Sequence, residues 1–183
     1  MNLPNKLSFL RVLLIPVFLL FVYLAFPGHM YAALAVFVLA SLTDLADGII
    51  ARKHHLVTDF GKFLDPLADK VLVMAAMLWF VEAGRMPAWC MLLVVAREFA
   101  VTALRLVAVG KGRVIAAAWS GKIKTASTMI GICLMLAATE LPFLAPEAVH
   151  ILDIICVAVI VVTTVYSGVE YFVRNRDAFS GAM

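Results

Sequence analysis

Residues 44–69 read DLADGIIARKHHLVTDFGKFLDPLAD, and this stretch determines how the rest of the chain is interpreted. It joins two long apolar runs and carries four aspartates close to the ends of those runs: Asp44, Asp47, Asp65 and Asp69. A charged residue inside an apolar membrane segment costs about 2.5 to 3.5 kcal/mol on insertion scales. Four acidic side chains in such a place therefore point to a function.

The chain around this stretch is strongly apolar. Of its 183 residues, 64% are hydrophobic and 15% are charged, with a mean hydropathy of +1.04, whereas a soluble domain is nearer half apolar and a quarter charged. We expect an all-α integral membrane protein with six transmembrane helices. These would form a single domain over residues 1–183, with a short cytoplasmic tail over about residues 174–183. The apolar runs cover residues 7–26, 30–51, 63–81, 87–109, 122–139 and 148–173.

Charge and cysteine content exclude other classes of protein. A net charge of +3 is too small for a nucleic-acid-binding protein. Cys90, Cys133 and Cys156 each stand alone in an apolar run, which argues against a disulfide framework or a cysteine metal site.

Positive charge is concentrated on alternate loops. If the amino terminus and every second loop share one side of the membrane, that side holds ten Lys and Arg residues and the other holds only Arg85. Cytoplasmic loops carry the excess of Lys and Arg, so we expect both termini and the second and fourth loops to be cytoplasmic. The ten residues are Lys6, Arg52, Lys53, Lys62, Lys111, Arg113, Lys122, Lys124, Arg174 and Arg176.

Helical spacing gathers each pair of aspartates on one face. Asp44 and Asp47 share an arc of roughly 100°, and Asp65 and Asp69 lie at i and i+4. Helices joined by a short loop are neighbours, so the four carboxylates can share a small volume, where they would repel one another without a counter-charge. Oxygen ligands suit Mg²⁺ or Mn²⁺, and two such ions are an established device for displacement at phosphorus. The alternative is that the aspartates cap helices or pair with Arg52, Lys62 and Lys70.

The spacing Asp44-x2-Asp47-Gly48-x2-Ala51-Arg52-x8-Gly61-x3-Asp65-x3-Asp69 resembles the signature of the CDP-alcohol phosphatidyltransferase family, with every fixed position filled. Residues 2–11, 96–105 and 120–125 are similar to a bacterial branch of that family. The resemblance implies the six-helix family fold in a bacterial inner (plasma) membrane, with the active site on the cytoplasmic side. It also implies an enzyme of phospholipid biosynthesis that transfers the phosphatidyl group of CDP-diacylglycerol to sn-glycerol 3-phosphate, giving phosphatidylglycerophosphate and CMP.

The resemblance also implies roles for individual residues. Asp44 and Asp65 would bridge two divalent cations, Mg²⁺ or Mn²⁺, while Asp47 and Asp69 would each complete one site. Asp69 would also be the catalytic general base that takes the proton of the attacking hydroxyl. The positions expected to bind the CDP-lipid are Asn5, Ser8, Gly48, Arg52, Thr58 and Gly61.

Four cations are expected to converge on one cytoplasmic-side pocket and to bind the phosphate of the acceptor. Two lie within or near the end of the fourth helix and two begin the fifth helix: Arg97, Arg105, Lys122 and Lys124. The alternative for such cations is snorkelling to anionic headgroups. Glu98 shares a helical face with Arg105 and is expected to orient it. A stripe on the fifth helix is expected to pack closely and to line the acceptor cavity: Ser120, Lys124, Ser127 and Gly131.

Two other classes of function compete with the enzyme. A divalent-cation transporter would also carry intramembrane aspartates, but it needs a polar path to the far side, where this sequence offers few charged residues. A non-catalytic scaffold would leave the aspartate pattern without a cause. Within the family, another acceptor such as inositol phosphate, phosphatidylglycerol or serine stays open. Membrane lipids are expected partners, nucleic acid is not, and a homodimer is compatible with a small polytopic enzyme.

Overall fold

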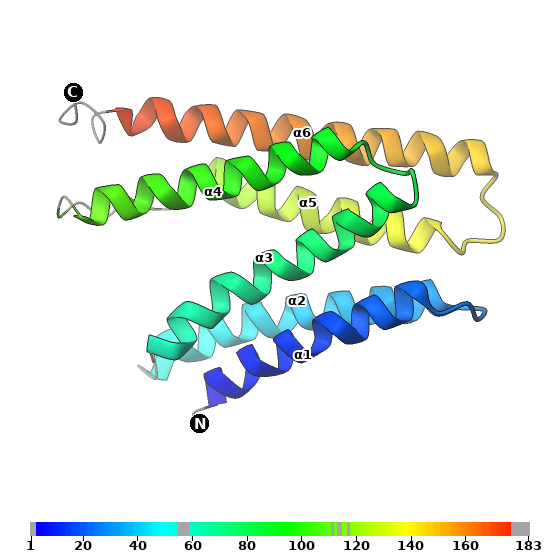
Figure 1. The fold of residues 1–183 in the computed structure, drawn as a ribbon, viewed down its shortest axis with the longest axis horizontal. Helices are drawn as coiled ribbons and strands as arrows, with labels where there is room; N and C mark the ends of the chain where they lie inside the picture. The colour runs from blue at the N-terminus through cyan, green and yellow to red at the C-terminus, as the bar shows by residue number, and fades with distance from the viewer. Residues whose placement is uncertain (1–2, 55–58, 111, 113–114, 117, 177–183) are drawn as a thin grey trace.

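The computed structural model shows a bundle of helices and describes residues 3–54, 59–110, 112, 115–116 and 118–176 (Figure 1). For residues 3–8, 44–54, 59–67 and 69 only the backbone is described. Six helices form in this part of the chain: α1 Leu3–Tyr23, α2 His29–His54, α3 Asp59–Glu82, α4 Ala88–Gly110, α5 Trp119–Ala138 and α6 Pro146–Arg174. Every boundary lies within four residues of the run expected from hydropathy, so the six-helix expectation is confirmed.

Successive helices run in alternating directions. One end of the bundle, here called the terminal end, holds the start of α1, the end of α2 and the start of α3, the end of α4 and the start of α5, and the end of α6 (Figure 1). The other end, the far end, holds the remaining three connections. There Gly28 and Gly84 adopt φ values of +87° and +70°, a region that disfavours residues with a Cβ. Gly28 directly precedes the start of α2 and Gly84 follows the end of α3, at breaks that the sequence predicts.

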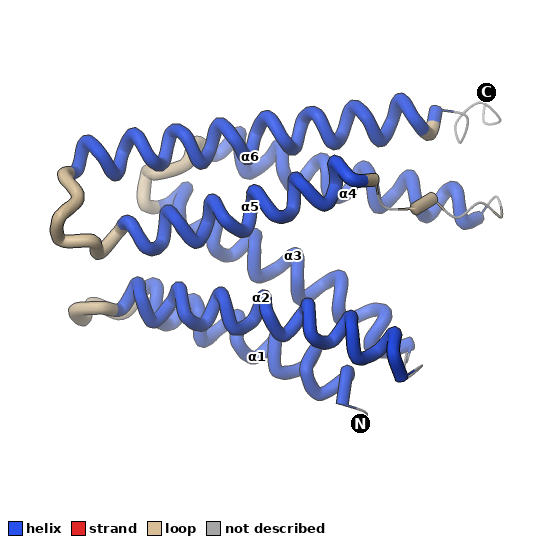
Figure 2. The backbone as a smooth tube through the Cα atoms, turned by 180° about the vertical axis from the view of Figure 1, so that it is seen from behind, coloured by secondary structure: helices blue, strands red, loops and turns tan. Residues whose placement is uncertain are grey.

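The third helix links two groups of helices. Seen from either side, α3 runs obliquely from the α1–α2 pair to the group formed by α4, α5 and α6 (Figure 2). Helix α1 packs on α2 and α3, α5 packs on α6 and α2, and α4 packs on α6 and α3. A core of large apolar side chains joins the two groups; it includes Phe18, Phe37, Phe80, Ile132 and Ile160.

The outer surface of the bundle is apolar as well. Large hydrophobic side chains such as Leu92, Phe99 and Leu106 are about two-thirds exposed, which is typical of a surface that meets lipid and unusual for a soluble monomer. Among the described residues, α5 and α6 are each long and apolar enough by themselves to cross a membrane. Helix α4 is of similar length and carries three charged residues, Arg97, Glu98 and Arg105.

A buried ion pair holds the far end together. Arg85, in the α3–α4 loop, donates from Nε to Asp153 Oδ2 at 2.8 Å and from Nη2 to Asp153 Oδ1 at 2.6 Å. Arg85 also donates to the Met135 carbonyl at 3.0 Å and to the Thr139 hydroxyl. The Asp153 side chain is only 4% exposed. The sequence gives Asp153 no role, and the structure assigns it this pairing between α6 and the α3–α4 loop.

Candidate functional site

A cleft of about 940 Å³ opens between α2, α4 and α5, with Lys70 of α3 and Tyr171 of α6 in its lining. Part of its wall is apolar and includes Leu42, Met129 and Ile130. Among the described residues, the charged side chains of the lining are four cations and one carboxylate: Lys70, Arg97, Arg105, Lys122 and Glu98. Since cations outnumber carboxylates in this lining, the cleft favours an anionic ligand that also has apolar parts.

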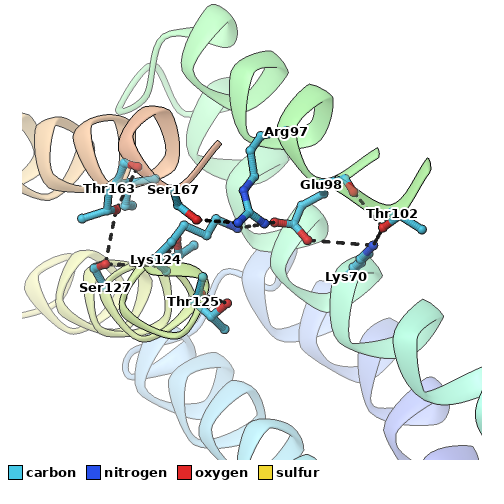
Figure 3. A network of polar contacts seen from close by, with 12 residues as sticks. Lys70, Arg97, Glu98, Thr102, Lys124, Thr125, Ser127, Thr163 and Ser167 are labelled. Atoms are coloured by element: carbon cyan, nitrogen blue, oxygen red, sulfur yellow. Dashed lines mark hydrogen bonds and ion pairs between the residues drawn. The ribbon is translucent and has the colours of Figure 1, made fainter. Parts of the chain in front are cut away.

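Glu98 is the centre of a network of buried charges (Figure 3). Its Oε1 accepts hydrogen bonds from Arg97 Nη1 and from Lys124 Nζ, each at 2.9 Å. Its Oε2 lies 3.9 Å from Lys70 Nζ, and this amine also donates to Thr102 Oγ1 at 2.8 Å. The Lys124 and Arg97 side chains are only 6% and 12% exposed, so Glu98 provides the counter-charge that such buried cations require.

Arg97 lies in a slot lined by two glycines. Its Nη2 donates to Ser167 Oγ of α6. A Cβ added at Gly168 would lie 3.3 Å from Arg97 Cγ, and one added at Gly121 would lie 3.6 Å from Arg97 Nη2. Both glycines therefore leave room for the arginine, and α4, α5 and α6 meet at this side chain.

Arg105 is bound by α6. Its Nε donates to Tyr171 Oη at 2.7 Å, and its guanidinium carbon lies 5.4 Å from the centroid of the Tyr171 ring. Tyr171 is only 2% exposed and packs with Val101 and Leu104 of α4. The expectation that Glu98 orients Arg105 is therefore wrong. The two side chains share a face of α4, but Arg105 bonds to Tyr171 of α6 and Glu98 bonds to Lys124 of α5.

The two lysines of α5 differ in their surroundings. Lys122 lines the cleft, with its Nζ 4.9 Å above the Trp119 ring. Lys124 is buried beside the cleft in its bond to Glu98. The structure thus brings Arg97, Arg105 and Lys122 to one cleft and holds Lys124 just behind it.

The polar stripe of α5 faces α6. A Cβ at Gly131 would lie only 3.1 Å from Ile160 Cδ1 of α6, which confirms that the stripe packs closely. None of the stripe lines the large cleft, whose α5 residues belong to the neighbouring face, which includes Thr125 and Met129. Lys124 lines a small pocket beside that cleft. The three cysteines are free, as expected.

The segments that carry the four aspartates adjoin the cleft along the chain. Asp44 and Asp47 lie in α2, and Asp65 and Asp69 lie in α3, two helices that contact each other. Ser41 of α2 and Lys70 of α3 line the cleft, and Lys70 directly follows Asp69.

The aspartate side chains lie outside the described residues, so their roles stay predictions. The same holds for the side chains expected at the CDP-lipid: Asn5, Ser8, Gly48, Arg52 and Gly61, and for Thr58 as a whole. Within the part whose side chains are described, no group of three or more metal-ligating residues occurs. Four carboxylates on two contacting helices are a donor set that suits small divalent cations.

Sequence reasoning misses three residues of this site: Lys70, Ser167 and Tyr171. Ser167 and Tyr171 stand four residues apart in an otherwise apolar helix, and that spacing of polar groups on one helical face is a usable signal. The sequence suggests Lys70 only as a partner for the aspartates.

Comparison with known proteins identifies relatives over nearly the whole chain. A family model described as CDP-alcohol phosphatidyltransferase matches residues 1–166. The chain is 44% identical over 190 residues to a Bacillus subtilis (strain 168) protein named CDP-diacylglycerol--glycerol-3-phosphate 3-phosphatidyltransferase, covering 97% of this chain and 96% of the relative. A Mycobacterium tuberculosis (strain H37Rv) protein named probable phosphatidylglycerophosphate synthase is 38% identical over 183 residues, covering 98% and 84%. An Escherichia coli (strain K12) protein with the same name as the Bacillus relative is 40% identical over 141 residues, covering 74% and 76%.

Proposed function

The chain belongs to the CDP-alcohol phosphatidyltransferase family, and from this premise we propose how its residues perform the reaction. The protein is a membrane enzyme of phospholipid biosynthesis. It transfers the phosphatidyl group of CDP-diacylglycerol to sn-glycerol 3-phosphate, and the products are phosphatidylglycerophosphate and CMP. The choice of sn-glycerol 3-phosphate within the family is supported by the names of the relatives. The excess of cations among the described residues of the cleft favours a phosphorylated acceptor over serine, because such an acceptor brings a phosphate dianion to the site.

Asp69 is the proposed general base. The acceptor hydroxyl loses its proton to the Asp69 carboxylate as its oxygen attacks the phosphorus that bears diacylglycerol. The bond from that phosphorus to the oxygen shared with the cytidylyl phosphate then breaks, and CMP leaves with the bonding electrons. Asp44, Asp47, Asp65 and Asp69 are the proposed ligands of two divalent cations, Mg²⁺ or Mn²⁺. When bound, these ions would stabilise negative charge on the entering and leaving oxygens.

The remaining residues of the site bind the two substrates. We assign the CDP-lipid to Asn5, Ser8, Gly48, Arg52, Thr58 and Gly61. Arg105 and Lys122 are proposed to contact the phosphate of the acceptor, since both line the cleft. Arg97 in the wall of the cleft and Lys124 behind it contribute positive charge, and Glu98 already accepts a hydrogen bond from each.

We further propose that residues 1–183 form one domain whose six helices all cross the membrane, with the terminal end of the bundle in the cytoplasm. The ten Lys and Arg residues counted on one side of the sequence support this orientation, and Arg85 alone stands on the other. An intramembrane site just beneath the cytoplasmic surface would let a soluble acceptor meet a lipid-bound donor.

Release of CMP by the purified protein tests the proposal. The protein in detergent is incubated with CDP-diacylglycerol, Mg²⁺ or Mn²⁺, and one of sn-glycerol 3-phosphate, inositol phosphate, phosphatidylglycerol or serine. We expect CMP with sn-glycerol 3-phosphate. Release with inositol phosphate alone would assign that compound as the acceptor while keeping the protein in the family. No release with any acceptor would refute the proposal that the protein is an enzyme.

A further inference from the structure

We infer that Tyr171 of α6 is a positioning residue for acceptor binding: it holds Arg105 through Nε and leaves both terminal nitrogens of the guanidinium for the acceptor's phosphate. The inference rests on the proposed function, in which Arg105 contacts that phosphate. It adds a residue from α6, the helix whose sequence otherwise shows only a general apolar pattern.

The geometry of the contact supports this role. An arginine that binds phosphate through a pair of parallel hydrogen bonds must present two nitrogens in a fixed plane. The bond from Arg105 Nε to Tyr171 Oη, 2.7 Å long, fixes one edge of the guanidinium. Among the contacts of the described residues, neither terminal nitrogen of Arg105 has a hydrogen-bond partner. Because both Arg105 and Tyr171 line the cleft, an anion in the cleft can reach those nitrogens.

Tyr171 is suited to hold another side chain in place. Its ring is buried against Val101 and Leu104, so the hydroxyl has a fixed position. The ring also lies 5.4 Å from the guanidinium carbon, where a cation is attracted to an aromatic face. The contact differs from that of Arg97, whose Nη1 and Nη2 are already bonded to Glu98 and Ser167. The two arginines of α4 therefore differ in role: Arg105 is available to a ligand, whereas the terminal nitrogens of Arg97 are bonded within the protein.

The test is the Tyr171→Phe variant, which removes the hydroxyl and keeps the buried ring. We expect the KM for sn-glycerol 3-phosphate to rise about tenfold, since hydrogen bonds to charged groups contribute effects of this size. The KM for CDP-diacylglycerol and kcat should change less than twofold. Tyr166→Phe is the matched control, because Tyr166 lies on the same helix and is 64% exposed; its kinetics should equal those of the original protein.

A double-mutant cycle with Arg105→Lys separates positioning from a merely structural role. A lysine at position 105 has neither the Nε–H that bonds to Tyr171 nor a planar guanidinium to orient. In that background Tyr171→Phe should therefore raise the KM for the acceptor by less than twofold. The same fold-change in both backgrounds would overturn the inference, as would an unchanged KM in the single variant. If the original protein releases CMP with another acceptor only, the proposed function fails instead, and the two failures are therefore distinguishable.

Discussion

Replacing Asp153 by alanine should lower the stability of the protein markedly without altering its substrate affinities. Asp153 accepts two hydrogen bonds from Arg85, at 2.8 and 2.6 Å, and both partners are largely buried. The variant leaves a buried guanidinium without its counter-charge. The pair lies at the far end of the bundle, and neither Arg85 nor Asp153 lines the cleft, so the KM values of both substrates should stay unchanged at temperatures where the variant is folded.

The contacts that the substitution removes give the approximate loss of stability. Hydrogen bonds to charged groups contribute about 1.5 to 3 kcal/mol each, and breaking a buried ion pair by removing one partner costs about 3 to 5 kcal/mol. Arg85 keeps its bonds to the Met135 carbonyl and to Thr139, so the lower part of the combined range applies, about 3 kcal/mol. For a chain of this length that corresponds to a Tm lower by roughly 6 to 12 °C.

Thermal unfolding in detergent measures this loss, with two further variants for comparison. Glu147→Ala removes an exposed carboxylate from the first turn of the same helix and should cost less than about 1 kcal/mol. Arg85→Met combined with Asp153→Leu removes both charges and should recover most of the lost stability, because apolar residues can replace a buried pair with little loss. If Asp153→Ala lowers Tm no more than Glu147→Ala does, the pair does not stabilise the fold and the reasoning fails.

Four further predictions concern the site. Arg105→Ala should raise the KM for sn-glycerol 3-phosphate at least about tenfold, and an equal rise in the KM for CDP-diacylglycerol would assign Arg105 to the other substrate. Asp69→Asn should lower CMP release by a factor of about 100 or more, since an amide cannot accept the proton, while a CDP-lipid binding assay still detects the complex; full turnover would exclude Asp69 as base. Gly168→Leu should displace Arg97 and lower the free energy of unfolding by about 1 to 3 kcal/mol, whereas Gly110→Leu should change it little, because nothing lies within 4 Å of a Cβ at Gly110. Excess chelator should stop CMP release and added Mg²⁺ or Mn²⁺ should restore it; undiminished release would contradict the cation proposal.

The sequence predicts the helices well because each boundary is decided locally. Hydropathy and glycines such as Gly28 and Gly84 mark where helices begin and end, and those signals lie within a few residues of the boundary. The cations of the cleft could be predicted for a similar reason, since Arg97 and Arg105 are conspicuous inside an apolar run.

Contacts between helices could not be predicted, because spacing along one helix does not say which neighbour a side chain meets. Arg105 and Tyr171 are 66 residues apart, and Arg85 and Asp153 are 68 apart. Glu98 illustrates the error that results: helical spacing pairs it with Arg105, whereas the fold brings Lys124 of α5 within 2.9 Å of it.

The far end of the bundle and the cleft differ in how their buried charges are paired, and this difference bears on function. At the far end one arginine meets one aspartate, and the pair leaves no net charge. In the cleft, four of the described lining residues are cations and Glu98 is the one carboxylate among them, although an uncompensated charge in an apolar environment is costly. Pairing at the far end shows that this fold can neutralise an arginine when nothing else is required of it. The excess of cations among these described residues therefore fits a ligand that neutralises it when bound, such as an acceptor with a phosphate dianion. The four aspartates that adjoin the cleft along the chain are assigned to the proposed divalent cations instead.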